Sequence, residues 1–234
     1  MIDEKTILKD VSFQVRSGEI TAILGSSGSG KTTVLKHLLG LYKSPGNTLS
    51  VLGKNPSELE EKEEKPFYRQ IGVLYQEGAL LNSLTVGENL SLPLQQHYEL
   101  PAGLIEQMVM IKLQQVNLEE AFDKYPSQLS GGMLKRAALA RAIVMEPPLL
   151  FCDEPGAGLD PLTMSRLDQL ILDLKNQLGM TVLMITHEVS STLRMADQIV
   201  FLDQGRSIFH GPPESALDRG PRIVKDFFAR GLGK

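Results

Sequence analysis

Short apolar runs alternate with longer amphipathic stretches along the chain. Each apolar run is four or five residues long, which is the length of a buried strand rather than of a helix. The runs are Ile20–Leu24, Ile71–Tyr75, Leu149–Cys152 and Val182–Ile185. Two stretches that follow such runs, Thr33–Leu41 and Leu162–Leu178, have the apolar spacing of helices. Strands that alternate with helices predict an α/β fold with a largely parallel sheet.

Weaker signals lie in the first third of the chain. Val11–Val15 alternates apolar and polar residues, which predicts a strand that ends at Ser17-Gly18. Gly46–Gly53 is typical of a hairpin or an edge strand, and these segments predict a small antiparallel β region. Glu58–Lys65 is almost entirely charged and is interpreted as a solvated helix face.

The last third predicts a hairpin followed by helix. Ile199–Leu202 and Ser207–Phe209 flank the turn residues Gln204-Gly205, and the chain from Pro212 has helical spacing.

The middle of the chain, from about Ala79 to Met145, is mainly helical, with turns around Pro101, Pro126 and Gly131-Gly132. We interpret it as a helical lobe inserted into the α/β core. The predicted organisation is one domain over residues 1–234, with the core at 1–78 and 146–234 and the lobe at about 79–145.

Composition narrows the class of protein. The net charge of −4 argues against a nucleic-acid-binding protein, which usually carries a basic excess. No apolar run approaches the roughly 20 residues of a membrane helix, and the acidic start at Met1 lacks the features of a signal peptide. A cytoplasmic location is therefore expected. Cys152, the only cysteine, lies in an apolar run and is expected to be a buried, inert thiol.

One segment matches the phosphate-loop pattern G-x-x-x-x-G-K-[ST]: Gly25-Ser26-Ser27-Gly28-Ser29-Gly30-Lys31-Thr32, followed by Thr33. It lies between a predicted strand and a predicted helix, as such a loop requires. Its backbone N–H groups and the positive end of the helix would hold phosphate oxygens. Lys31 is expected to reach the β- and γ-phosphates, and the Thr32 hydroxyl is expected to ligate Mg²⁺. The sequence therefore predicts a site for ATP.

Two acidic residues end the strand Leu149–Cys152. Ligands of parallel sheets lie at the carboxyl ends of the strands. Asp153 is therefore placed to hold Mg²⁺ or its water, and Glu154 is placed to orient or deprotonate the attacking water.

A second anion-binding helix start is predicted at Leu129-Ser130-Gly131-Gly132-Met133, which precedes a strong helical run. Ser130 is a helix-capping residue type, and the two glycines expose N–H groups at the positive end. One nucleotide per chain needs only one such site, so this one is expected to serve a nucleotide held by a second copy. That implies a homodimer.

Together these motifs resemble the ATP-binding subunit of ABC transporters, over nearly the whole chain. Gly25–Thr32 looks like Walker A, Leu149–Glu154 like Walker B, and Leu129–Met133 like the ABC signature. The remaining matches are to the family's Q-loop glutamine, D-loop aspartate and switch histidine: Gln76, Asp160 and His187. The resemblance implies a P-loop NTPase core of the ABC type.

The resemblance also implies roles for these residues. Glu154 would be the catalytic base and His187 would contact the γ-phosphate. Gln76 would sense Mg²⁺ and the attacking water, so Thr32, Gln76 and Asp153 form the expected metal site. Ser130–Gly132, with Asp160, would close over the ATP of the opposite subunit in an ATP sandwich.

A finer resemblance is to the Mce/Mla-type ATPases, which move phospholipids or other lipids between membranes. It is carried by Glu77–Val86, Leu92-Pro93-Leu94 and Met133–Ala142. It implies a multi-span membrane permease as partner, an Mce-type substrate-binding protein in the complex, and a place on the cytoplasmic face of the inner membrane. One departure is that the aromatic residue that normally stacks on adenine would fall in the first few residues, where none is aromatic.

Other functions stay open at this point. A soluble ABC ATPase of DNA repair would carry a long coiled coil, and a translation-type member usually carries two cassettes; neither feature is visible. An ABC importer or exporter ATPase for another substrate is the other alternative. A generic phosphate-loop kinase would not explain Leu129–Met133.

Overall fold

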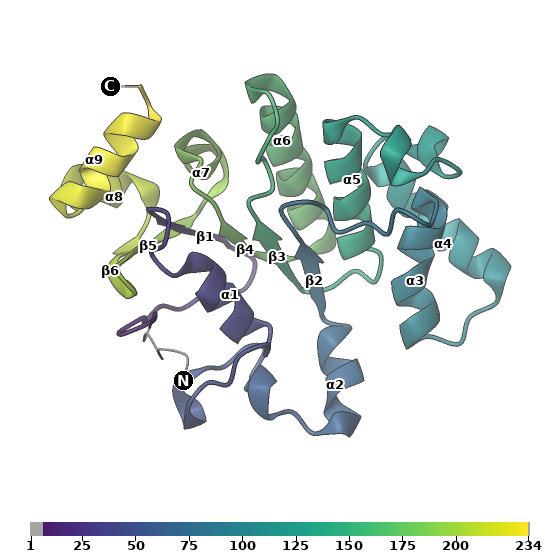
Figure 1. Cartoon of the computed structure of the whole chain (residues 1–234), viewed down its shortest axis with the longest axis horizontal. Helices are drawn as coiled ribbons and strands as arrows, with labels where there is room; N and C mark the ends of the chain where they lie inside the picture. The colour runs from purple at the N-terminus through teal and green to yellow at the C-terminus, as the bar shows by residue number, and fades with distance from the viewer. Residues whose placement is uncertain (1–6, 234) are drawn as a thin grey trace, which may run out of the picture. The chain divides into compact units, whose positions relative to one another are not determined.

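The computed structural model describes residues 7–233, without the side chain of Asn47 (Figure 1). The chain forms two compact units. The first comprises Met1–Val15, Thr21–Pro66 and Ile185–Lys234, and the second comprises Arg16–Ile20 and Phe67–Met184. Each unit holds part of a β-sheet and its own helices.

The sheet of the first unit consists of three strands in the order β1-β5-β6: β1 (Ile20–Gly25), β5 (Gln198–Asp203) and β6 (Arg206–Gly211). β1 and β5 are parallel, whereas β5 and β6 are antiparallel. The turn between β5 and β6 has φ 45 at Gln204 and φ 78 at Gly205. Positive φ at both central residues is what a two-residue hairpin turn of type I′ requires. The predicted C-terminal hairpin is therefore confirmed.

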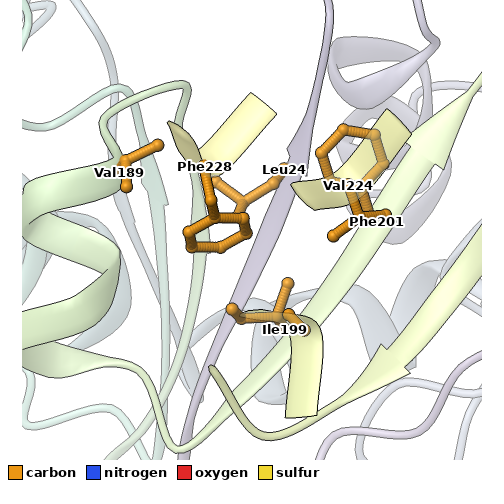
Figure 2. Packing of buried hydrophobic residues seen from close by; sticks show 7 residues of the cluster. Leu24, Val189, Ile199, Phe201, Val224 and Phe228 are labelled. Atoms are coloured by element: carbon orange, nitrogen blue, oxygen red, sulfur yellow. The ribbon is translucent and has the colours of Figure 1, made fainter. Parts of the chain in front are cut away.

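The core of this unit lies between its strands and the C-terminal helices (Figure 2). The helices are α7 (Val189–Met195), α8 (Pro213–Arg219) and α9 (Arg222–Gly231). Apolar side chains from these three helices and from strands β1 and β5 form one buried cluster: Leu24, Val189, Ile199, Phe201, Ala216, Val224 and Phe228. β1 reaches the phosphate loop at Gly25, so this core fixes the base of that loop.

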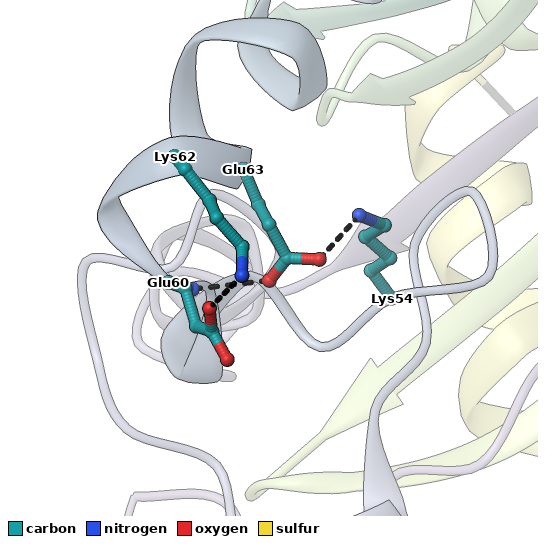
Figure 3. Close-up of polar contacts among 4 residues, drawn as sticks. All are labelled: Lys54, Glu60, Lys62 and Glu63. Atoms are coloured by element: carbon teal, nitrogen blue, oxygen red, sulfur yellow. Dashed lines mark hydrogen bonds and ion pairs between the residues drawn. The ribbon is translucent and has the colours of Figure 1, made fainter.

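The other helices of the first unit follow the phosphate loop. They are α1 (Lys31–Leu38), the 3₁₀ turns η1 (Gly46–Thr48) and η2 (Pro56–Glu58), and the beginning of α2 (Glu61–Tyr68). Figure 3 shows the charged surface at the start of α2, where Lys54 pairs with Glu63 at 2.8 Å and Lys62 pairs with Glu60 at 2.7 Å. These pairs are solvated, as predicted for Glu58–Lys65.

The second unit contains the strand order β2-β3-β4: β2 (Ile71–Leu74), β3 (Leu149–Asp153) and β4 (Thr181–Ile185). β2 and β3 are parallel, with Leu74 opposite Cys152. The helices are α3 (Val86–His97), α4 (Ala102–Gln115), α5 (Gly131–Ala142) and α6 (Pro161–Leu178), with the 3₁₀ turns η3 (Glu119–Ala121) and η4 (Pro126–Gln128). α3, α4 and α5 pack against one another, and α5 also packs against β2 (Figure 1).

Local signals explain where these helices begin. Thr85 and Glu88 form a reciprocal capping box at the start of α3, and Asp160 caps α6. Cys152 is buried, as expected, and burial raises the pKa of its thiol to about 12. None of the helices in the described part of the chain is long and apolar enough to cross a membrane.

Two predicted β segments are wrong. Val11–Val15 keeps its alternating exposure but forms no strand, because only Asp10 makes a bridge to β6 and the side chain of Ser207 bonds the backbone of Ser12 in place of a ladder. Gly46–Gly53 contains a 3₁₀ turn and a single bridge between Val51 and Lys54. Residues 10–12 lie beside β6 but bond it through one bridge and the side chain of Ser207, and the bridge of Gly46–Gly53 joins two residues of its own turn.

Candidate functional site

The phosphate loop joins β1 to α1 in the first unit, as the sequence predicted. Gly30 is the N-cap of α1, with φ 108, and no side chain caps the helix. A Cβ at Gly30 would lie 2.7 Å from Cδ2 of Leu8, so the position requires glycine on both conformational and steric grounds. The first N–H groups of a helix have no partner within the helix. This helix start can therefore receive an anion.

Lys31 is the first residue of α1, and its side chain folds back onto the loop that precedes the helix. Its Nζ donates to the carbonyl oxygens of Gly25, at 2.8 Å, and Ser26, at 3.1 Å. The backbone N–H of Ser29 donates to the Ser26 carbonyl at 3.1 Å, which closes the loop into a turn. Ser26, Ser27 and Gly28 are exposed, as is Thr32, so the loop presents its backbone and a hydroxyl to solvent. A cation beside a helix start that has no side-chain cap suits a polyphosphate.

His187 belongs to the same unit. The backbone N–H of Thr186 donates to the Ile23 carbonyl at 3.2 Å, which places His187 beside the strand that ends at the phosphate loop. Its ring is 58% exposed, and Nε2 lies 3.7 Å from a carboxylate oxygen of Glu188. His187 therefore lies in the same unit as the phosphate loop, and its contact with the γ-phosphate stays a prediction.

The acidic strand end lies in the second unit. Because β2 and β3 run parallel with Leu74 opposite Cys152, Gln76 and Glu154 follow at the same level beyond the two strands. Asp153 and Glu154 are half-buried, and Glu154 has φ 47. A non-glycine residue in that region costs about 1–2 kcal/mol, which surrounding contacts must offset. A predicted metal-binding glutamine and a predicted catalytic acid thus share one end of the sheet.

Lys135 on α5 reaches this strand end, which the sequence reasoning missed. The side chain is buried, at 5% exposure, and Nζ donates to the backbone carbonyl of Gln76. Burial lowers the pKa of Lys135, whereas the negative charges of Glu77, Glu154 and Asp153 act in the opposite direction. The available signal was a lysine at a core-facing position of an otherwise small and apolar helix face.

Ser130 caps α5, as predicted. Its Oγ accepts from the backbone N–H of Met133 at 3.3 Å. Ser130 and Gly131 are exposed, and a Cβ on Gly132 would lie 2.8 Å from Cγ2 of Thr163 on α6. The absence of a side chain at Gly132 therefore allows α5 to approach α6 closely.

Asp160 caps α6 and accepts from the N–H groups of Leu162, at 3.1 Å, and Thr163, at 3.0 Å. Hydrogen bonding from Thr163 is the largest cause that lowers the pKa of Asp160. The aspartate therefore has a structural role in addition to the predicted nucleotide-binding role.

The predicted site residues divide between the two units. The first unit holds the loop Gly25–Thr32, Thr33 and His187, and the second holds Gln76, Ser130, Gly131, Gly132, Asp153, Glu154 and Asp160. The position expected for an adenine-stacking aromatic falls within residues 1–6, outside the described residues. A side-chain carbon of Ile7, which is exposed, lies 3.7 Å from where a Cβ on Gly30 would be. Ile7 is thus an apolar surface beside the phosphate loop.

A pocket of about 430 Å³ in the second unit contains none of these residues. It is lined by Ser91, Gln95, Leu100, Ala102, Ile105, Glu106 and Phe122. This lining carries a carboxylate and no cation, so it does not suit a polyphosphate.

Comparison with known proteins decides the family. Residues 8–157 match the family model described as ABC transporter. The chain belongs to the ABC transporter family.

Individual relatives agree with this assignment. The chain is 37% identical to the probable ribonucleotide transport ATP-binding protein mkl of Mycobacterium leprae, over 94% of this chain and 64% of that protein. It is 39% identical to the intermembrane phospholipid transport system ATP-binding protein MlaF of Escherichia coli K12, over 93% and 80%. The chain thus spans less than two thirds of the mycobacterial protein.

A solved structure confirms the fold. The ATP-binding cassette MJ0796, a dimer in a post-hydrolysis state bound to ADP and Pi, matches with a TM-score of 0.79 at 30% identity, covering 88% of this chain and 90% of that one. The predicted P-loop NTPase fold of the ABC type is therefore confirmed.

Proposed function

We propose that this ABC protein is the ATP-binding and ATP-hydrolysing subunit of a membrane transporter. The observation that carries the proposal is the phosphate loop, in which Lys31 lies beside an uncapped helix start. Family membership and the MJ0796 cassette with its ADP and Pi support the same activity.

The described residues fit ATP with Mg²⁺. The Thr32 hydroxyl, the Gln76 amide and the Asp153 carboxylate are hard oxygen donors, which Mg²⁺ prefers. When bound, Mg²⁺ would neutralise charge on the β- and γ-phosphates. Lys31 would bind the same phosphates, His187 would donate to the γ-phosphate, and Glu154 would accept the proton of the attacking water.

The active form in this proposal is a homodimer with two composite sites. Ser130–Gly132 begin a helix whose cap satisfies Met133 and whose exposed first turn faces solvent. Such a start has an affinity for anions but carries no cation of its own in its first turn. We infer that it closes over ATP held by the phosphate loop of the partner, together with Asp160, the N-cap of α6, which packs against α5. The dimeric state of MJ0796 supports this inference.

The test of the enzymatic role is Glu154→Gln. The amide keeps the shape of the side chain but cannot accept a proton, so ATP binding should persist while hydrolysis falls by about 10²–10⁴-fold. Nucleotide binding by titration calorimetry and phosphate release measure the two effects. Glu120→Gln, a change of the same chemistry at an exposed position in η3, is the matched control and should hydrolyse normally. A Glu154→Gln protein that hydrolyses ATP at more than about a tenth of the wild-type rate would contradict the assignment of Glu154.

The partner in this proposal is a multi-span permease, docked on residues 76–94 at the cytoplasmic face of the membrane. The loop that follows Gln76 is held by side chains rather than by secondary structure. Buried Asn89 bonds both N–H and C=O of Leu81 and the carbonyl of Leu84. Despite this ordering, the Leu81 side chain is 49% exposed. An ordered loop that presents leucine to water is typical of an interface.

The docking proposal predicts that Leu81→Glu weakens pull-down of the permease and lowers transport more than basal ATPase. Leu84→Glu, at a half-buried position, should do the same to a smaller extent. Glu99→Lys, an equally drastic change at an exposed position after α3, should leave the pull-down intact. Normal binding by both leucine variants would place the docking surface elsewhere.

The substrate we propose is a phospholipid or another lipid, with an Mce-type protein in the complex, on the similarity to MlaF. The similarity to mkl supplies the second candidate, since that protein is named for ribonucleotide transport. Identification of the permease that copurifies with this chain, followed by transport assays with a labelled phospholipid and a labelled ribonucleotide, separates the two. Copurification with no membrane protein would favour a soluble ABC ATPase instead.

A further inference from the structure

Helix α5 is attached to the segment that follows β2 at three backbone carbonyls. Lys135 donates to Gln76, and Arg141 donates to Gly78 at 2.9 Å and to Ala79 at 2.7 Å. α5 also packs directly against β2 (Figure 1). Two cations on one helix therefore hold three carbonyls of residues 76–79, a segment outside the strand β2.

The environment of Lys135 differs from that of Lys112, a second buried lysine of the same unit. Lys112 on α4 is 3% exposed, and its Nζ lies 2.6 Å from a carboxylate oxygen of Glu146. Lys135 is 5% exposed, yet its hydrogen bond goes to a neutral carbonyl. A buried charge normally needs a close counter-ion. The structure thus retains a lysine at a place where packing alone would favour an apolar residue.

The carboxylates whose negative charges raise the pKa of Lys135 belong to the acidic strand end and to the residue after Gln76. Glu77 follows the residue that Lys135 bonds, and Asp153 and Glu154 end the adjacent parallel strand. One ammonium therefore interacts with the ends of β2 and β3 at once: with one by a hydrogen bond and with the other by charge.

Ser130, the N-cap of α5, lies five residues before Lys135. That distance is less than two turns of helix, so the anion-facing start of α5 and the hydrolytic strand end are joined by one short rigid element. Movement of the helix start moves Lys135, and the bonds from Lys135 and Arg141 move the Gln76–Ala79 backbone with it.

We propose that Lys135 is a positioning residue that ties the start of α5 to the Gln76 backbone and to the Asp153–Glu154 strand end. Glu154 then adopts its hydrolytic position only when α5 is in place. This inference rests on the proposed ATPase function, in which α5 of one subunit closes over the nucleotide of the other. Lys135 would make closure at one composite site a condition for hydrolysis at the site that contains its own chain's Glu154.

The first test concerns the tether and needs no nucleotide. Lys135→Met keeps the length of the side chain and removes its charge and its donor. The amide of Gly78, which donates to Tyr75 at 2.8 Å, reports on the segment. Hydrogen–deuterium exchange of a peptide spanning residues 75–84 should become about 10-fold faster in this variant, the factor expected for loss of one charged hydrogen bond. Lys112→Met, which removes the other buried lysine of the same unit, should leave this peptide unchanged.

The second test concerns hydrolysis. Lys135→Met should lower kcat by about 10-fold or more and change KM for ATP by less than about 2-fold, because Lys135 is not one of the residues proposed to bind the phosphates. Lys135→Arg, which keeps a cationic donor, should restore most of kcat. Lys112→Met should lower the melting temperature without this change in kcat. If Lys135→Met does not fold, Lys135→Gln serves in both tests, because its shorter side chain also releases the Gln76 carbonyl.

The outcomes separate cleanly. Wild-type exchange and wild-type kcat in Lys135→Met overturn the proposal, and so does faster exchange with an unchanged kcat. Equal effects of Lys112→Met would reduce Lys135 to a general stabiliser and also overturn it. A wild-type protein without ATPase activity would refute the proposed function, and the coupling role with it, while the exchange data would still decide whether Lys135 holds the segment.

Discussion

The starts of α1 and α5 look alike in the sequence and differ in the structure. Both are glycine-rich and both follow an extended segment. The N-cap of α1 is Gly30, which provides no side-chain cap, and the side chain of Lys31 bonds the preceding loop. The N-cap of α5 is Ser130, whose hydroxyl accepts from the N–H of Met133, and the first turn of α5 carries no cation.

In the proposed function, this difference would make one helix start a complete anion site and the other half of one. α1 has no side-chain cap and has an ammonium from the same chain beside its start, a combination that suits phosphates. α5 is stable by itself because it is capped, and it offers only the remaining N–H groups. A helix start of the second kind can complete a site that another copy begins.

The strongest test of this comparison is Lys31→Ala. The variant removes the ammonium that would face the β- and γ-phosphates, and ATP affinity of the isolated protein should fall by about 10²–10⁴-fold, the value of two hydrogen bonds to a charged group. Titration calorimetry measures the change. Lys36→Ala, on the same helix but outside the loop, should bind ATP normally. Near-native ATP affinity in Lys31→Ala would contradict the assignment of the α1 start as the phosphate site.

The corresponding change at α5 is Ser130→Arg. A bulky cation at this start should block closure on the partner's nucleotide and lower hydrolysis by about 100-fold, while ATP binding to the isolated monomer stays within about 2-fold. Ser130→Ala removes the cap without adding bulk and is the control for helix stability.

Mixing Ser130→Arg with Lys31→Ala sharpens the result. Each mixed dimer keeps one composite site with two unaltered halves, so the mixture should recover part of the activity that neither variant has alone. Full activity of wild-type protein as a strict monomer would contradict the composite site.

A smaller effect is expected from the glycines of the two starts. Gly30→Ala should destabilise the protein by about 1–2 kcal/mol because its φ of 108 is unfavourable for alanine, and Leu8→Ala should not reverse this. Gly132→Ala meets only Cγ2 of Thr163. In a Thr163→Ser background the same substitution should become neutral or stabilising by up to about 1 kcal/mol. Thermal unfolding of the single and double variants measures the stability change at each glycine. If Leu8→Ala restored the stability of Gly30→Ala, or if Thr163→Ser failed to restore that of Gly132→Ala, the expected difference between the two glycines would be contradicted.

The smallest effect concerns a third helix start, that of α6, whose N-cap Asp160 is a titratable residue. Hydrogen bonds from Thr163 and Leu162 lower its pKa, so its contribution to stability is complete above the unfolded-state pKa and declines as the pH falls through the folded-state pKa. Asp160→Asn keeps the acceptor without titrating. The melting temperature of the wild type should therefore fall slightly more than that of Asp160→Asn between about pH 7 and pH 3. Asp160→Ala should be less stable than both at pH 7, and identical pH profiles for the wild type and Asp160→Asn would contradict the cap.

Much of the candidate site could be predicted because its signals are local. The pattern Gly25–Thr32, the Ser130 cap and the acids after Cys152 each depend on residues close in sequence and on the strand or helix beside them. The four apolar strand runs and the β5–β6 hairpin were predicted for the same reason. The division of the chain into a core and a helical lobe at residues 79–145 stays a prediction.

The errors and omissions depend on distant partners. Val11–Val15 has the pattern of a strand, but Ser207, far along the chain, bonds its backbone through a side chain instead. Lys135 looks like any lysine of a surface helix, and only the packing of α5 on β2 buries it beside Gln76.

The sequence by itself determined which loop has the phosphate-binding pattern, which acids follow the strand and which helices are capped. These features follow from backbone conformation and from hydrogen bonds within a few residues. Only the tertiary structure decided which buried charge acts on the acid and what holds the segment after Gln76. The burial of a charge and the pairing of a strand depend on residues that are far apart in the sequence and come into contact only on folding, so a local sequence pattern does not predict them.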